Sequence, residues 1–165
     1  MDNSKTTHQT GPQLTRRALL KNTLAVGFVA SMAVAPVYAK DAIYTSFLNN
    51  KAISGYDAVS YFQDGGPKEG SKNFITNYMG ADWYFTSQEN LDLFTANPEK
   101  YAPQYGGYCA YAVAQGSTAK GDPLQWHVQN DKLYLNINKS IKKKWLADID
   151  GYLEKSEKNW PNVLK

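Results

Sequence analysis

The sequence predicts a small α+β domain preceded by a removable leader. Two pairs of short aromatic and β-branched runs, residues 73–79 with 82–86 and residues 124–129 with 132–137, have the composition and intervening turn residues typical of β-hairpins. Each pair is followed by a segment with apolar residues at helical spacing, residues 87–97 and 139–158. The expected architecture is therefore a single domain of two antiparallel hairpins packed with two main helices.

The first 39 residues have the three parts of a secretory signal peptide. Arg16 and Arg17 precede an apolar run of small residues from Leu24 to Ala35, and Val37 and Ala39 then fit an A-x-A-type cleavage site. The adjacent arginines resemble the twin-arginine export signal of bacteria, and the apolar run is too short to span a membrane comfortably. We expect cleavage after Ala39, export to the periplasm, and no stable membrane anchor in the mature chain, residues 40–165.

Composition excludes several classes of protein once the leader is removed. The leader contains four of the 18 basic residues and one of the 15 acidic residues, so the remaining chain carries 14 of each and no formal net charge. A basic surface for nucleic acid is therefore not expected. The mature chain also holds one cysteine, Cys109, and one histidine, His127. It can form neither an internal disulfide nor a four-ligand Cys and His zinc site within one chain.

Local signals place the boundaries of the elements. Asp57 is positioned to cap a helical turn, with a site carboxylate as the alternative. Gly80–Ala81 is the expected turn of the first hairpin. Ser87 and Asn138 occupy the N-cap positions of the two main helices, and Pro98 ends the first of them. The sequence shows no evident internal repeat.

The strongest candidate for a functional site is the segment Tyr105–Ala112. It places Cys109 after two glycines, which allow a sharp turn or a close approach, and among three tyrosines. The thiol is a buried small hydrophobe, a metal ligand, a reactive redox thiol or half of an intermolecular disulfide. Tyr108 and Tyr111 are candidates for lining a pocket beside it.

His127, a lone histidine on a strand, is either an ordinary surface or core residue or the second ligand of a site at Cys109. Imidazole and thiolate both bind copper well, and in a redox site the imidazole would serve as the base for the thiol. We therefore predict that Cys109 and His127 lie close together in the fold. Met79 is a conceivable third ligand, although a methionine in a hairpin more often fills gaps in the core.

Several motifs occur in this chain in a combination that is typical of one family. They are Gly55–Phe62, Trp83–Ser87, Asn97–Tyr101, Gln104–Ala110 and Lys132–Asn136. In these motifs the chain resembles the exported YHS-domain proteins, which are small α+β modules. YHS domains are often appended to copper transporters and metal-dependent enzymes. The resemblance therefore implies metal binding at a site that includes Cys109, with copper the expected ion.

The resemblance has a second implication, and the chain departs from the family in one respect. Some exported relatives are identified as selenoproteins with selenocysteine at the position of Cys109, which implies redox or metal chemistry there. YHS domains associated with metals commonly carry paired cysteines where this chain has Thr86 and Ser87–Gln88. Hydroxyl and amide side chains are poor ligands for soft metals.

Three classes of function remain open from the sequence. The first is a periplasmic module that binds or delivers a metal ion, with copper at Cys109 and His127. The second is a redox protein that uses the Cys109 thiol without a metal. The third is a non-catalytic module that binds a small molecule or a periplasmic protein. No particular enzymatic reaction is predicted.

Overall fold

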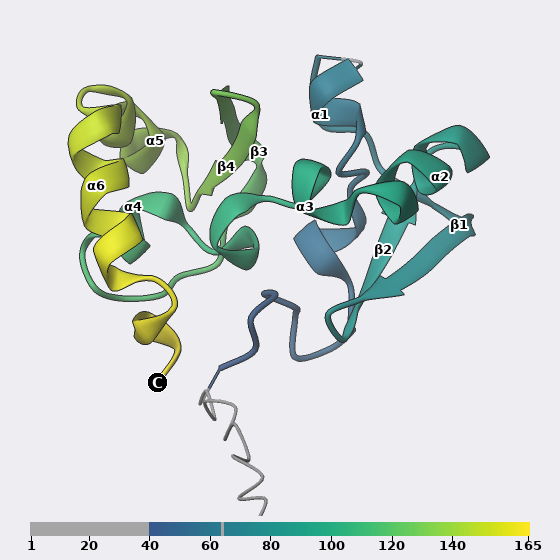
Figure 1. Ribbon diagram of the computed structural model, residues 1–165, viewed down its shortest axis with the longest axis horizontal. Helices are drawn as coiled ribbons and strands as arrows, with labels where there is room; N and C mark the ends of the chain where they lie inside the picture. The colour runs from purple at the N-terminus through teal and green to yellow at the C-terminus, as the bar shows by residue number, and fades with distance from the viewer. Residues whose placement is uncertain (1–39, 64) are drawn as a thin grey trace, which may run out of the picture. The chain divides into compact units, whose positions relative to one another are not determined.

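The structure is a computed structural model that describes residues 40–63 and 65–165 (Figure 1). The predicted leader, residues 1–39, lies outside the described residues, so its cleavage and export remain predictions. The described residues all belong to one compact unit. None of their helices is both long and apolar enough to cross a membrane.

The first half of the unit contains the first predicted hairpin and helix. A 3-10 turn, η1 (Ala52–Gly55), leads to α1 (Ser60–Gln63), to the hairpin of β1 (Ser71–Tyr78) and β2 (Ala81–Phe85), and then to α2 (Gln88–Ala96) and α3 (Pro98–Tyr101). The hairpin turn lies at Met79–Gly80, one residue before the expected position, because both of these residues adopt positive φ. Ser87 caps α2 as predicted, since its side chain accepts a hydrogen bond from the Asn90 backbone N–H.

The second half contains the second hairpin and a broken helix. Its elements are η2 (Gln104–Gly107), α4 (Ala110–Ala114), β3 (Asp122–Gln129), β4 (Lys132–Asn136), α5 (Lys139–Leu146), α6 (Ile149–Asn159) and η3 (Asn162–Leu164). The single helix predicted for residues 139–158 is wrong, because Asp148 leaves the helical region with φ −154° and ψ 65°. Its carboxylate then accepts from the Gly151 N–H and starts α6 as an N-cap.

The two halves share the same backbone fold, so the expectation of no internal repeat is wrong. In β1 and β2, Ser71 pairs with Phe85 and Thr76 with Trp83; in β3 and β4, Asp122 pairs with Asn136 and His127 with Tyr134. Each of these residues is matched 51 positions later, and both hairpins have an irregularity after the first pair. The N-caps Ser87 and Asn138 are also 51 positions apart. We call residues 52–101 the first repeat and residues 104–159 the second repeat.

Backbone conformation in the entry turns supports the same correspondence. Ile53, Ser54 and Gly55 have φ of 40°, 59° and 87°. Their counterparts 52 positions later, Tyr105, Gly106 and Gly107, have φ of 57°, 59° and 85°. Gly70 N–H donates to Gly55 O at 2.9 Å, and Gly121 N–H donates to Gly107 O at 3.1 Å. The sequences agree mainly in the motif Gly-Tyr-x-Ala, at residues 55–58 and 107–110.

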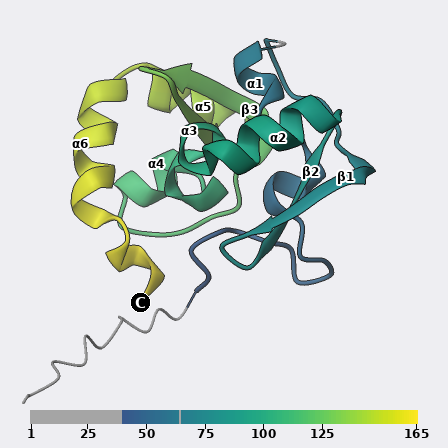
Figure 2. The same ribbon diagram turned by 45° about the vertical axis from the view of Figure 1, so that its right-hand side comes forward.

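Each repeat is associated with a hydrophobic cluster, and strand β4 joins the two clusters. Leu133 and Leu135 pack with the first cluster, whose largest buried members are Trp83, Phe85 and Phe94. Tyr134, between them on β4, packs with the second cluster. The other buried members of this cluster are Tyr105, Tyr108, Ala110, Val113, Trp145 and Leu164. Because side chains alternate across a strand, β4 supplies one face to each core. Figure 2 shows α4 and α6 on the side of the second repeat, away from β1 and β2.

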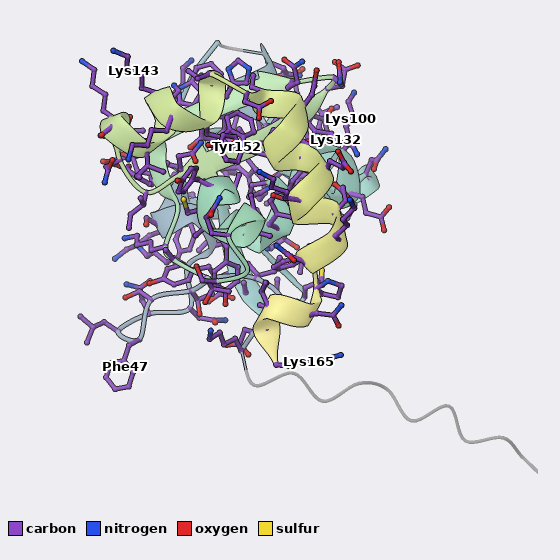
Figure 3. The ribbon with its side chains drawn as sticks, turned by 90° about the vertical axis from the view of Figure 1, so that its left-hand side faces the viewer. Phe47, Lys100, Lys132, Lys143, Tyr152 and Lys165 are labelled. Atoms are coloured by element: carbon purple, nitrogen blue, oxygen red, sulfur yellow. The ribbon has the colours of Figure 1, made fainter. Side chains whose placement is uncertain are left out.

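The lead-in, residues 40–51, runs along the two repeats before η1. The Tyr44 N–H donates to Gly106 O at 2.8 Å, and the Asn50 side chain donates to Gly80 O at 2.7 Å. Between these anchors Phe47 projects into solvent from the loop (Figure 3). The lead-in therefore contacts both the first hairpin and the Gly-rich turn of the second repeat.

Candidate functional site

Cys109 belongs to the second repeat, and its side chain is 0% exposed. It precedes α4, and its Sγ lies 3.7 Å from Asn136 Oδ1 as a hydrogen-bond donor. The same Asn136 oxygen accepts from the Tyr111 backbone N–H at 3.3 Å, and Asn136 is itself fully buried. The thiol therefore faces an amide inside the protein and is closed to solvent.

His127 lies on β3, opposite Tyr134 of β4, and within the described residues no hydrogen bond or ring contact joins it to Cys109. Cys109 forms a β-bridge with Leu135, so it lies along β4 on the edge that β3 does not occupy. Two strand spacings, about 10 Å, therefore separate the Cys109 and His127 backbones. The His127 ring packs edge-on against Trp145, with centroids 5.8 Å apart. A joint copper or redox site of these two residues remains a prediction.

The core of the second repeat contains buried polar atoms that lack a hydrogen-bond partner. Within residues 40–63 and 65–165 these side-chain atoms are His127 Nε2, Asn136 Nδ2 and Trp145 Nε1. All three belong to the second repeat. Because an unpartnered buried polar group costs free energy, we expect this core to be less strongly stabilised by its polar contacts than that of the first repeat.

Tyr108 and Tyr111, the predicted pocket residues, lie in different surroundings. The Tyr108 hydroxyl donates to Asp41 O at 2.9 Å, and its ring lines a hollow of about 420 Å³ beside Lys40 and Tyr44. Burial, reinforced by the Asp41 carboxylate and by Tyr44, raises the pKa of the Tyr108 phenol. Tyr111 instead packs on Tyr152, with centroids 5.1 Å apart. Neither ring opens a path to the Cys109 sulfur, which remains fully buried.

Asp57 is the counterpart of Cys109 in the first repeat, and the predicted cap role is confirmed. The carboxylate is fully buried. Its Oδ1 accepts from the backbone N–H groups of Val59 at 2.8 Å and Ser60 at 3.3 Å. Its Oδ2 accepts from Thr86 N at 2.8 Å, Thr86 Oγ1 at 2.7 Å and Asn90 Nδ2 at 2.7 Å. Five donors thus surround one carboxylate, and they tie α1 to the start of α2.

The described residues show no cluster of metal ligands at Cys109 or at Asp57. None of their His, Cys, Asp and Glu side chains forms a group of three or more that could hold one. Thr86, which stands where metal-associated YHS domains commonly carry cysteine, is hydrogen-bonded to Asp57. Met79 is 57% exposed at the hairpin turn, so its interpretation as core filler is wrong.

A cleft that no single sequence motif indicated lies between the repeats. Its volume is about 450 Å³, and four separate segments supply its walls: the lead-in, the β1–β2 turn, the connector from α3 to η2, and the C-terminal tail. Its larger lining side chains are Ile43, Tyr78, Met79, Glu99, Gln104, Tyr105, Trp160 and Leu164. Sequence analysis missed this site because its walls are up to about 120 positions apart along the chain, and local patterns carry no information on such contacts.

Comparison with known proteins identifies one segment of the chain. Residues 59–105 match the family model of the YHS domain. The match covers the first repeat from α1 onward and ends within η2, so the hairpin and helices of the second repeat lie outside it. Searches of curated proteins and of solved structures found no match.

Proposed function

The chain is a YHS domain-containing protein, and on that premise we propose that it is a non-catalytic binding module of the periplasm. Its ligand-binding site is the cleft between the two repeats, and Cys109 has a structural role. The observation that carries the proposal is the state of the Cys109 sulfur, which is 0% exposed and hydrogen-bonded to Asn136.

A redox role for Cys109 is disfavoured by its burial. Thiol chemistry requires a thiolate that can meet its substrate, and reactive cysteines occupy partly exposed, electropositive surroundings. Cys109 instead contacts an amide oxygen within the core. Packing explains its position without any reaction, because a free cysteine behaves as a small hydrophobe.

Copper binding at Cys109 is disfavoured by the absence of a fitting set of ligands. YHS domains are associated with metal binding in general, but in this chain the corresponding positions of the first repeat are occupied by the Asp57 network. In the second repeat the thiol contacts Asn136, and His127 packs on Trp145. A soft metal would need these core contacts to open before it could reach both side chains.

The cleft has the size and position of a ligand site. Small-molecule sites are concave, mostly apolar, preformed, and often located where domains meet. The 450 Å³ cleft falls within the usual range of volumes and is lined mainly by apolar and aromatic side chains. It therefore offers a binding surface that the buried thiol does not.

One experiment separates the three classes of function. Protein purified after folding in the presence of copper should contain no stoichiometric copper, and its thiol should react slowly with iodoacetamide until denaturant is added. Matched measurements on Cys109→Ala supply the background for both assays. Stoichiometric copper that is lost in Cys109→Ala would establish the metal site instead. Fast native alkylation, with a sulfenate trapped at Cys109, would establish the redox thiol.

Export is tested at the N-terminus of the secreted protein. Mass spectrometry of the periplasmic fraction should give a chain that begins at Lys40. Substitution of Arg16 and Arg17 by lysine should reduce export if the pair is read as a twin-arginine signal. A periplasmic protein that retains both arginines would contradict cleavage.

A further inference from the structure

We infer that the cleft between the repeats binds an amphiphilic cation, a ligand with an aromatic or apolar body and one amine group. The inference rests on the proposed function, because it names the ligand class for the same cleft. It follows from three properties of the cleft: its aromatic walls, its single charged side chain, and the rigid contacts that hold its walls.

The walls supply a surface for an apolar body. Tyr78, Tyr105 and Trp160 contribute aromatic rings, and Ile43 and Leu164 contribute aliphatic surface. The rings of Tyr105 and Trp160 lie 5.7 Å apart, so they form one continuous wall. Met79 lies at the turn of the first hairpin and is 57% exposed, so its flexible thioether is available to a ligand.

Charge selects the polar end of the ligand. Glu99, in the first turn of α3, is the single charged side chain of the lining, which contains no lysine, arginine or histidine. No side chain within the described ranges forms an ion pair with its carboxylate. A ligand cation would therefore meet both an acidic partner and the electron-rich faces of the aromatic rings. An anion of the same shape would be repelled by the carboxylate.

The walls are fixed before any ligand arrives. Tyr44 N–H donates to Gly106 O at 2.8 Å, which holds the lead-in against the connector. A side chain at Gly106 would collide with the carbonyl oxygen of Ala42, a residue of the cleft wall. Glycine is therefore required there for the lead-in to lie this close. A preformed site binds without the cost of ordering its walls.

The test is a titration of the purified protein with three ligands of matched shape. The probes are 1-naphthylmethylamine, 1-naphthylmethanol and the carboxylate of 1-naphthaleneacetic acid (the acetate), which are cationic, neutral and anionic at pH 7. Isothermal titration should show the amine binding about fivefold more tightly than the alcohol, as expected for an exposed ion pair. The acetate should bind more weakly than both.

Two pairs of variants locate the site. Glu99→Gln should reduce the preference for the amine over the alcohol, whereas Glu89→Gln, which changes an exposed residue of α2, should leave that preference intact. Met79→Ala should weaken all three probes, and Ile75→Ala, which alters an exposed β1 side chain outside the cleft, should not. Both cleft variants change exposed side chains, so neither depends on refolding of the core.

The outcomes separate this inference from the proposed function. Equal binding of the amine and the alcohol to the unmodified protein would overturn the inference, and so would an amine preference that Glu99→Gln does not reduce. Neither result alters the copper and alkylation assays, which test the role of Cys109. Conversely, copper bound through Cys109 would overturn the proposed function, whatever the titrations show.

Discussion

The carboxylate of Asp57 and the thiol of Cys109 occupy corresponding positions in the two repeats. The Asp57 backbone N–H donates to Lys68 O at 2.8 Å, and the Cys109 N–H donates to Ala119 O at 2.9 Å, 51 positions after Lys68. Asp57 caps its own short helix through the Val59 N–H. In the second repeat the corresponding Tyr111 N–H is satisfied by Asn136.

The two repeats also differ at the strand residue beside this position. Asn136 of β4 corresponds to Phe85 of β2, because each pairs with the first residue of its hairpin, Asp122 and Ser71 respectively. The aspartate-to-cysteine difference between the repeats is therefore accompanied by a phenylalanine-to-asparagine difference. The buried amide supplies the acceptor that a cysteine cannot provide.

The Asp57 network is predicted to be a major source of stability. Asp57→Ala would leave the N–H groups of Val59 and Thr86 without an acceptor, and the Asn90 amide would lose one of its two. Since each unsatisfied buried group costs about 1–3 kcal/mol, we expect a loss of about 3–5 kcal/mol in the free energy of unfolding. Urea denaturation measures it. Asp92→Ala, which removes a single exposed hydrogen bond in α2, is the control. A loss as small as that of the control would contradict the role of the network.

The contact between Cys109 and Asn136 should appear as an energetic coupling. A double-mutant cycle of Cys109→Ala and Asn136→Ala compares the two single variants with the double variant by urea denaturation. We expect the losses to be non-additive by about 1 kcal/mol, because each substitution removes the same contact. Additivity within about 0.3 kcal/mol would mean that the sulfur and the amide do not interact.

The repeat predicts that two distant glycines respond alike to substitution. A side chain at Gly70 would approach Tyr84 backbone atoms to 2.5 Å, and one at Gly121 would approach Leu135 Cβ to 2.7 Å. Tyr84 and Leu135 are themselves 51 positions apart. Gly70→Ala and Gly121→Ala should each lower the free energy of unfolding by about 1–3 kcal/mol, as overpacking does.

Gly66→Ala is the control for this pair, because its nearest atom outside the adjacent residues would lie at 3.7 Å. Thermal denaturation of the three variants gives the comparison. If Gly70→Ala and Gly121→Ala unfold at the same temperature as the control, the backbone at these two glycines is not as crowded as the structure describes.

Alkaline pH should destabilise the fold through its buried tyrosines. Burial, with a smaller contribution from the Glu157 carboxylate, raises the pKa of Tyr134 to about 12. Burial also raises the pKa values of Tyr61 and Tyr105. In the unfolded chain these phenols ionise near pH 10. The neutral phenols therefore stabilise the fold fully below pH 10, and this stabilisation is lost as pH rises toward 12 and above.

Urea denaturation between pH 8 and pH 12, with tyrosinate absorbance recorded in parallel, measures this loss. Tyr134→Phe should reduce the decline of unfolding free energy between pH 10 and pH 12, because phenylalanine does not ionise. An identical decline in the variant would show that Tyr134 does not contribute.

Local signals in the sequence determined the elements of this protein. Ser87 and Asn138 cap helices as expected, because a cap requires only a side chain and a backbone N–H three residues later. The two hairpins formed for a similar reason, since alternation and turn residues act between neighbours. The break at Asp148 was equally local, and the carboxylate together with Gly151 was the signal for it.

The tertiary structure alone decided the surroundings of the candidate residues. Cys109 is buried because Asn136, 27 positions away, closes over its sulfur. The cleft exists because four distant segments meet at the junction of the repeats. The repeat is not evident in the sequence because a shared backbone conformation requires particular residues at few positions, chiefly glycines at crowded or positive-φ sites. Core side chains can differ between the repeats as long as they pack well. Contacts between distant segments depend on the packing of the whole chain, so no local pattern specifies them.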